Sequence, residues 1–384
     1  EISSEVPATY LQLSEHVEFI LDQDAASMLT RFDTPWLVKD CLWDEKLTRK
    51  AVIWLANFLG KPVLKLTEDD YNNNGMSQLA VERGPVYNIN INIFNKLQHT
   101  ITGWPGGKPN ADDSQRPERA EPASKRAIIF SPHPDDDVIS MGGTFIRLVD
   151  QKHDVHVAYQ TSGNTAVWDD DALRFVEFSI DFSEKMGLDK TELTGLYQKM
   201  REFMEQKLPN QVDTPEIQAV KGLIRKGEAI AGARYCGLED DHIHFMALPF
   251  YESGKNQKNP VTDADVLLTM ELLQKVKPHQ VFAAGDFEDP HGTHIVCFNI
   301  ILEALRRLSA TEDWVKDCWL WMYRGAWQEF ETHEIEMAVP LSPQEVERKK
   351  FAIFKHQSQK DRAVFPGDDA REFWKRAEDR NRET

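Results

Sequence analysis

The 384-residue sequence is poor in cysteine, and the few cysteines are far apart. The four of them, Cys41, Cys236, Cys297 and Cys318, form no C-x-x-C pair or other close spacing. This excludes a cysteine-rich zinc module and a dense disulfide framework, because both need closely spaced thiols. Sparse cysteines favour a reducing compartment, and we expect a cytoplasmic protein.

Long apolar runs and excess positive charge are also missing. No stretch approaches the roughly 18 apolar residues that a membrane-spanning helix needs. Residues 1–10 have neither the basic nor the apolar part of a signal peptide. With 45 Lys and Arg against 63 Asp and Glu, the formal net charge is −18, which opposes binding to nucleic acid or an anionic membrane. We expect neither partner, although a local positive pocket could still admit a small anionic substrate.

The composition suits a folded globular protein, since 41% of the residues are hydrophobic and 28% are charged. Residues 103–124 carry four prolines, three glycines and many charges, which disfavours regular secondary structure. We therefore expect three parts: an N-terminal segment over residues 1–105, a linker or extended loop over 106–124, and a domain over 125–384. In the first part, short strands at 36–38 and 63–66 and a helix at 47–59 predict a small α/β segment.

The domain after the linker alternates between strand and helix patterns. Strand 126–130, helix 138–149 and strand 154–160 form a βαβ unit. Further helices are expected at 222–235, 266–276 and 295–308, and further strands at 242–248, 280–284 and 318–323. This alternation predicts a Rossmann-like α/β fold, in which a mainly parallel sheet carries helices on both faces.

The first chemical motif is Ser131-Pro-His-Pro-Asp-Asp-Asp137, which directly follows a predicted strand. Ligands bind at this edge of open α/β sheets. His133 and Asp136 are close enough in sequence to meet at one metal ion, and Asp135 would be free for acid–base chemistry. An acidic surface loop with an aspartate at a helix start is the competing interpretation.

The second motif, Asp289-Pro-His-Gly-Thr-His294, also lies between a strand and a helix. His291 and His294 have the i, i+3 spacing that places two side chains on one side of a turn. Histidines at a helix start are often plain surface residues. Together, however, the motifs offer two imidazoles and a carboxylate at one sheet edge, and catalytic zinc sites use such a set with one position open to water.

These motifs, with Thr161-x-Gly163 and Arg225-x-x-Glu228, resemble the PIG-L/LmbE-type zinc-dependent N-deacetylases over residues of about 124–360. The resemblance implies hydrolysis of the acetamide of an N-acetylglucosamine-type amino sugar, with its 6-phosphate as one candidate, and one zinc ion as cofactor. It implies the following roles: His133, Asp136 and His294 as zinc ligands, Asp135 as general base, His291 as the group that stabilises or protonates the tetrahedral intermediate, and Arg225 as a substrate contact.

The sequence departs from the family pattern in two places. Asp137 stands where the family usually has Glu, and Gly292-Thr293 replaces a Pro-Asp pair between the two histidines. Outside the resemblance, His153, His156, His242 and His244 alternate along predicted strands, and we expect structural roles for them.

The N-terminal segment resembles the region after the catalytic core of bacterial glucosamine-6-phosphate deaminase fusions. The isomerase's phosphate loop and catalytic residues are missing, and the chain starts at Glu1. We therefore expect a C-terminal fragment of a longer protein, covalently fused to an N-terminal isomerase or deaminase domain. Two alternatives to the deacetylase remain: a non-catalytic sugar-binding or scaffolding module of such a deaminase polypeptide, and a metal-assisted hydrolase of a phosphoester or thioester.

Overall fold

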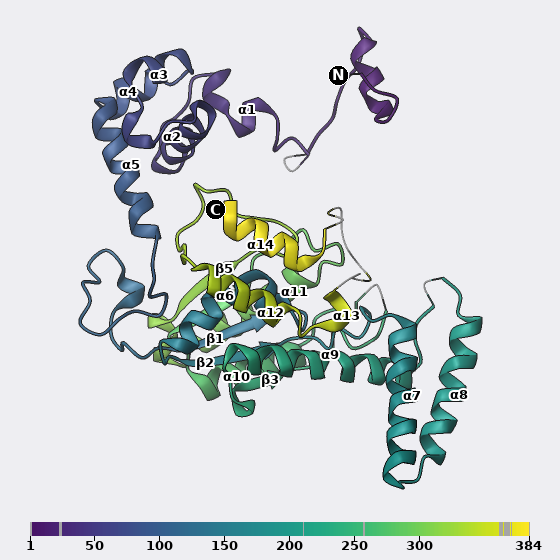
Figure 1. The fold of residues 1–384 in the computed structure, drawn as a ribbon. Helices are drawn as coiled ribbons and strands as arrows, with labels where there is room; N and C mark the ends of the chain where they lie inside the picture. Colours follow the sequence, from purple (N-terminus) through teal and green to yellow (C-terminus); the bar gives the residue numbers. More distant parts are fainter. Residues whose placement is uncertain are drawn as a thin grey trace. The chain divides into compact units, whose positions relative to one another are not determined.

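The computed structural model describes residues 2–22, 25–209, 211–255, 258–360, 364, 369 and 371–383. Contacts between Cα atoms divide the chain into two units, Glu1–His99 and Thr100–Thr384 (Figure 1). Among the described residues, no helix is both long enough and apolar enough to cross a membrane.

The regular elements described in the first unit are all helices, joined by irregular segments. Its α-helices are α1 (Thr30–Asp33), α2 (Glu45–Leu59), α3 (Glu68–Asn73), α4 (Ser77–Arg83) and α5 (Val86–Thr100), with 3-10 turns at Pro7–Leu13, Pro35–Leu37 and Val63–Lys65. The Asp44 side chain accepts a hydrogen bond from Leu47 N at the start of α2, and Gly60 ends this helix in the left-handed region. Apolar side chains such as Trp36, Leu55 and Tyr71 form the core of this unit.

The predicted α/β character of this segment is wrong. Residues 36–38 and 63–66 are not strands but lie in or beside 3-10 turns. The backbone amides of Lys65 and Leu66 donate to Pro62 O and Val63 O at 2.8 and 3.3 Å. The hydrogen-bonding needs of these amides are thus met within the turn. A strand would instead need a neighbouring strand, and the described part of this unit contains no strand.

The second unit contains a five-stranded sheet. The strands are β1 (Arg126–Ser131), β2 (Asp154–Tyr159), β3 (Ile243–Phe245), β4 (Gln280–Ala284) and β5 (Trp319–Tyr323). Their order is β3-β2-β1-β4-β5, and the four pairings are parallel, so the predicted fold class is confirmed for this unit. The strand predicted at 242–248 is shorter, although Met246 N and Leu248 N still donate to Tyr159 O and Gln160 O at 2.9 Å.

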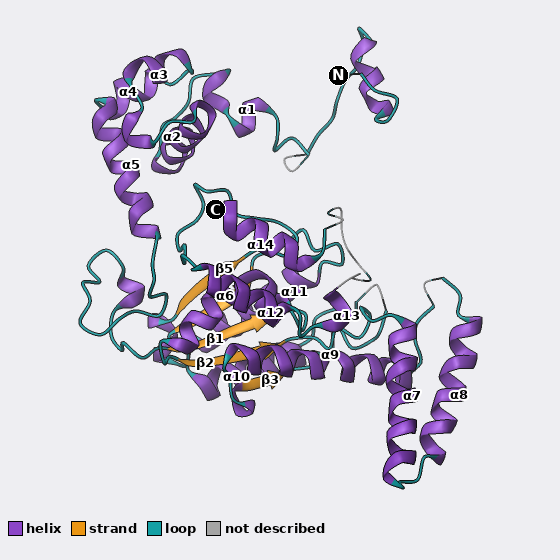
Figure 2. Ribbon diagram, in the orientation of Figure 1, coloured by secondary structure: helices purple, strands orange, loops and turns teal. Residues whose placement is uncertain are grey.

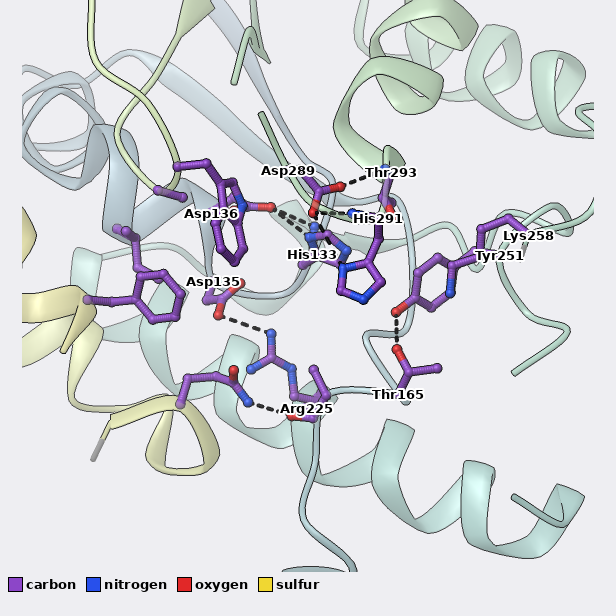
Figure 3. A pocket seen from close by; sticks show the side chains of 16 residues that line it. His133, Asp135, Asp136, Thr165, Arg225, Tyr251, Lys258, Asp289, His291 and Thr293 are labelled. Carbon is purple, nitrogen blue, oxygen red and sulfur yellow. Dashed lines mark hydrogen bonds and ion pairs between the residues drawn. The ribbon is translucent and has the colours of Figure 1, made fainter. Parts of the chain in front are cut away.

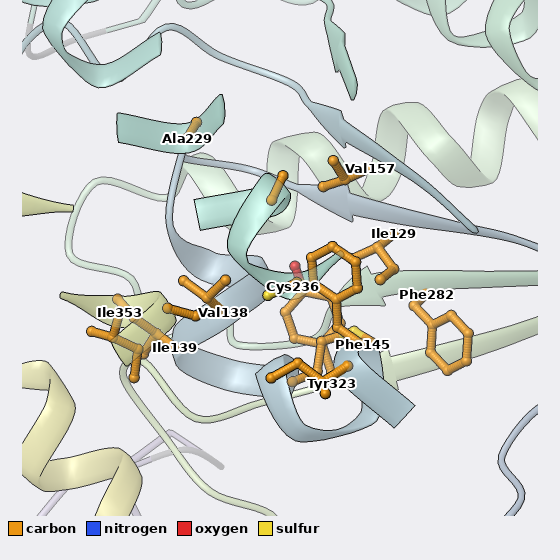
Figure 4. Close-up of a cluster of buried hydrophobic side chains, with 14 of the residues drawn as sticks. Ile129, Val138, Ile139, Phe145, Val157, Ala229, Cys236, Phe282, Tyr323 and Ile353 are labelled. Atoms are coloured by element: carbon orange, nitrogen blue, oxygen red, sulfur yellow. The ribbon is translucent and has the colours of Figure 1, made fainter. Parts of the chain in front are cut away.

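Helices cover both faces of the sheet (Figure 2). One face packs against α6 (Asp136–Asp150), α9 (Pro215–Cys236) and α12 (Pro343–Ile353), and the other against α10 (Asp263–Val276) and α11 (Thr293–Leu308). Side chains alternate along β1, so Ile129 joins the first core with Val138 (Figure 4), while Ile128 joins the second.

The remaining helices of this unit are α7 (Asp169–Met186), α8 (Thr191–Gln206), α13 (Gln357–Lys360) and α14 (Phe373–Glu383). Residues 106–124 form a loop with one 3-10 turn at Pro117–Arg119. Just before this loop, Pro105 O accepts a hydrogen bond from Gln280 Nε2 at 3.1 Å.

Candidate metal centre and active site

The loops that carry the two motifs meet at the carboxyl edge of the sheet. One loop joins the end of β1 to α6, and the other joins the end of β4 to α11. Because β1 and β4 are parallel neighbours, both loops leave the sheet at the same edge. A pocket opens there (Figure 3). Five of the six predicted site residues line it: His133, Asp135, Asp136, Arg225 and His291.

The sixth, His294, lies buried directly beside His133 and Asp136. His133 Nδ1 is 3.3 Å from Asp136 Oδ2, His294 Nε2 is 3.2 Å from the same oxygen, and the two imidazole nitrogens are 3.3 Å apart. Zinc–ligand bonds of 2.0–2.1 Å in a tetrahedron place neighbouring ligand atoms about 3.3 Å apart. The three atoms therefore have the spacing of one face of a zinc tetrahedron, and the donor set fits this metal.

The electrostatics of this triangle also suit a cation. Burial opposes ionisation of Asp136, but the charges and hydrogen bonds of His294 and His133 hold the pKa of its carboxyl well below the usual value. Burial alone would lower the pKa of His294, yet Asp136 raises it to about 9. At neutral pH, a metal ion would therefore have to displace a proton from His294, and metal binding should tighten as the pH rises.

Asp135 lies on the pocket wall and is held by Arg225. Arg225 Nη2 is 3.1 Å from Asp135 Oδ2, and both side chains are buried. Within the described residues, Nε and Nη1 of Arg225 have no hydrogen-bond partner, so this buried guanidinium keeps donors for another group in the pocket. Gly163 makes room for it: with φ of +63°, a Cβ there would lie 3.0 Å from Arg225 Nε and 2.9 Å from Pro134 Cδ.

A second carboxylate, that of Glu228, stabilises the charge of Arg225. Glu228 lies one turn further along α9 and accepts two hydrogen bonds from Ser358, one from its N and one from its Oγ, both at 2.7 Å. Burial raises the pKa of Glu228, against the charge of Arg225 and these hydrogen bonds. The neighbouring Gln359 lines the pocket and donates to Ala166 O at 2.6 Å.

His291 lies on the opposite wall, near Asp289. The His291 Nδ1 atom is 3.8 Å from Asp289 Oδ1. Asp289 also accepts hydrogen bonds from Thr293 N at 2.6 Å and His294 N at 3.3 Å, so it fixes the start of α11 and thereby the position of His294. Burial would raise the pKa of Asp289, but the hydrogen bond with His291 and the neighbouring imidazoles lower it.

Asp137, which departs from the family pattern, points into the core. Ser131 Oγ and Tyr159 Oη donate to it at 3.3 and 3.0 Å, and its own N donates to Ser131 Oγ at 3.1 Å. Burial raises the pKa of Asp137 to about 7. The shorter carboxylate therefore secures the loop that carries His133 rather than facing the pocket.

Several pocket residues were not among the predicted site residues, including Thr165, Tyr251, Lys258, Asp289 and Gln359. Asp289 belongs to the second motif, and its place before a helix could have indicated its role, since an aspartate there commonly accepts hydrogen bonds from the backbone amides of the first helical turn. Tyr251 and Lys258 lie in a loop whose path no periodic pattern specifies. Gln359 comes from a short helix far from the motifs in sequence, and only the fold brings it to the pocket.

Comparison with known proteins gives a family match over much of this unit. Residues 128–305 match the PIG-L family, described as GlcNAc-PI de-N-acetylase. A glucosamine-6-phosphate deaminase-like protein of Bacteroides thetaiotaomicron is 53% identical over 386 residues, which include 100% of this chain and 58% of that relative. The chain therefore spans less than two thirds of the relative's length.

Two solved structures are among the matches. N,N′-diacetylchitobiose deacetylase from Pyrococcus horikoshii is 18% identical with a TM-score of 0.36, covering 61% of this chain and 70% of that one. GalB, the 4-carboxy-2-hydroxymuconate hydratase from Pseudomonas putida, is 17% identical with a TM-score of 0.35, covering 66% and 82%. At these TM-scores, neither supports a conclusion about activity. The matched range contains both histidine motifs and Arg225, and the resemblance predicted from them is confirmed as a match to the PIG-L family over residues 128–305.

Proposed function

We propose that this chain is a zinc-dependent hydrolase that removes the N-acetyl group from an N-acetylglucosamine-type amino sugar. The observation that carries the proposal is the triangle of His133 Nδ1, Asp136 Oδ2 and His294 Nε2, with sides of 3.2–3.3 Å, beside an open pocket. The family match to a de-N-acetylase supports the choice of amide hydrolysis.

The three ligands would hold zinc, which when bound supplies Lewis-acid activation of a water molecule and of the amide carbonyl. Asp135 is the general base: its carboxylate accepts a proton from the attacking water and later returns it to the departing amine. His291 donates a hydrogen bond to the oxygen that becomes negative as the tetrahedral intermediate forms. Arg225 orients Asp135 through the 3.1 Å contact and offers its remaining donors to the substrate.

The 6-phosphate of the sugar is the part of the substrate that we assign to Lys258. Its ammonium lies 3.8 Å from the centre of the Tyr251 ring, on the pocket lining. Burial lowers the pKa of Lys258, and a phosphate would favour its charged form. Lys258→Ala should raise KM for the phosphorylated substrate more than for the unphosphorylated one, whereas an equal change for both would remove the assignment.

Acetate release from a panel of N-acetylated amino sugars, with and without a 6-phosphate, tests the proposed function. We expect release by the zinc-loaded chain and none after zinc is stripped with a chelator. Asp135→Asn should retain zinc and lose activity. Zinc-loaded protein that releases no acetate from any member of the panel would contradict the proposal.

Two other readings give different outcomes in the same assay. A non-catalytic sugar-binding or scaffolding module would bind members of the panel without releasing acetate and without zinc. A metal-assisted hydrolase of phosphoesters or thioesters would bind zinc and release phosphate or thiol from such conjugates instead.

The curated relative's name connects the deacetylase proposal to amino-sugar metabolism. We propose that this chain works covalently linked to a deaminase-like domain that consumes the amino sugar it produces, in the cytoplasm. The relative's greater length and its name support this link. The 384-residue chain alone should then show no glucosamine-6-phosphate deaminase activity, and detection of that activity would refute this division of labour.

A further inference from the structure

A second group of histidines and carboxylates lies at the amino edge of the sheet, where strands β2 and β3 begin. Asp154 begins β2 and His156 follows two residues later, while His242 immediately precedes β3 and His244 lies within it. Because β2 and β3 are parallel neighbours, with Ala158 paired to His244, these side chains gather on one face. We call Asp154, His156 and His242 the edge cluster.

The edge cluster has the spacing of a metal site. Asp154 Oδ1 is 3.1 Å from His242 Nε2 and 3.4 Å from His156 Nε2, and all three ligand atoms lie within 4.8 Å of one another. The two distances from Asp154 lie on either side of the roughly 3.3 Å that separates neighbouring ligand atoms in a zinc tetrahedron. Two imidazoles and one carboxylate again leave one position open.

In both imidazoles, the nitrogen that does not face Asp154, Nδ1, already has a partner. His242 Nδ1 is 2.9 Å from Asp241 Oδ1, which gives the carboxylate–histidine pairing that commonly orients a metal ligand. His156 Nδ1 is 3.0 Å from His244 Nε2, so a neighbouring imidazole orients the other ring. Each ring thus turns Nε2 toward Asp154 and uses Nδ1 for support, as metal-binding histidines do.

The charges and exposure of the edge cluster are compatible with an ion arriving from solvent. The side chains of Asp154 and His242 are 43% and 30% exposed. Around His156, the carboxylates of Asp154 and Asp241 act to raise its pKa, and the ammonium of Lys275 from α10 acts to lower it. The carboxylates outnumber this ammonium, and the local balance favours a cation.

We propose that Asp154, His156 and His242 bind a second divalent cation of the zinc class, separate from the candidate active site. Such an ion would join β2 to the segment that leads into β3. That strand is only three residues long and lies at the sheet edge, so one added cross-link would stabilise it. This role is structural and does not depend on the proposed deacetylase activity.

Zinc stoichiometry of the full 384-residue chain tests the proposal. The protein is stripped with a chelator, dialysed against zinc, and its metal content measured. We expect about two zinc ions per chain in the wild type, about one in His294→Ala, about one in His242→Ala and none in the double variant. In the His294→Ala background, zinc should also raise Tm, and adding His242→Ala should abolish that rise.

Controls separate the edge cluster from general histidine binding and from misfolding. His99→Ala removes an exposed histidine of α5 and should leave two zinc ions. Asp154→Asn keeps the side-chain size and should lose one, with an unchanged circular dichroism spectrum. If the wild type binds one ion that His294→Ala abolishes, the edge site is refuted and the active site stands. If that single ion depends on His242 instead, the edge site stands and the proposed function fails.

Discussion

The two histidine–carboxylate clusters use similar ligands but lie in different surroundings. At the carboxyl edge, the His294 and Asp136 side chains are 1% and 4% exposed, and Asp135 and His291 line the same pocket. At the amino edge, the neighbouring carboxylate and imidazole, Asp241 and His244, bind the outer nitrogens of the ligands. A set of metal ligands alone therefore does not make an active site, because acid–base groups must also face the open position.

Replacing one histidine of each cluster by alanine should give the largest contrast in activity. His294→Ala should lower acetate release by more than about 10³-fold, because loss of the ion removes both water activation and oxyanion stabilisation. His242→Ala should leave kcat/KM within about twofold. Steady-state acetate release measures both variants. Equal losses in both would mean that the clusters do not differ in the way described.

Asp135→Asn tests the acid–base half of the comparison. The amide cannot accept the proton of the attacking water, so kcat should fall by about 10²–10⁴-fold. Zinc content should not change, because Asp135 is bound to Arg225 rather than to the ligand triangle. Single-turnover kinetics with parallel metal analysis measures this variant, and retained activity would remove Asp135 from the mechanism.

A buried histidine near the carboxyl-edge site, His356, should make the stability of the protein depend on pH. His356 is fully buried, and this burial lowers its pKa to about 4. In the unfolded chain this histidine has its ordinary, higher pKa of about 6.5 and is therefore protonated at a higher pH than in the folded protein. Stability should then fall as the pH drops from about 6.5 toward 4. Between pH 7 and 5, this histidine should cost about 2 kcal/mol of unfolding free energy.

Urea unfolding of zinc-free wild type and His356→Gln at both pH values isolates this contribution. The variant should lose less stability than the wild type on acidification, and the difference between the two losses is the predicted quantity. Other histidines with lowered pKa values, such as His244 and His279, contribute to both proteins and cancel. Parallel losses would show that His356 does not titrate as described.

Glu228→Gln should lower activity less than His294→Ala or Asp135→Asn. It removes the charge behind Arg225 while keeping a similar shape and an acceptor for Ser358, and we expect a fall in kcat of about tenfold. KM and zinc content should stay near the wild-type values, since Glu228 acts by positioning. Glu216→Gln, an exposed change on the same helix, is the matched control. A larger effect on zinc content than on kcat would contradict this role.

Local patterns sufficed to predict much of the second unit. The apolar run at 280–284 predicted β4 with its observed bounds, because both faces of a central parallel strand are buried. The same reasoning failed at 63–66, where an apolar run occurs in a helical unit without a neighbouring strand. An apolar run shows that a segment is hydrophobic, but whether it becomes a strand depends on what lies beside it.

The candidate sites show the same limit. His133 and His294 could be expected to meet, because each follows a strand that ends at the same sheet edge. His156 and His242 were expected to be structural, since the pairing of β2 with β3 that brings them together is not visible in either segment alone. Lys258 reaches the pocket from an irregular loop and Gln359 from the four-residue helix α13, and both segments are too short or too irregular to show a periodic pattern.

Anomalous diffraction at the zinc absorption edge, from crystals of the zinc-loaded chain, would locate the bound ions. We expect a strong peak about 2.1 Å from His133 Nδ1, Asp136 Oδ2 and His294 Nε2, open to the pocket on its fourth side. A second peak should lie at Asp154, His156 and His242. Zinc-loaded crystals without a peak among the first three residues would contradict the account.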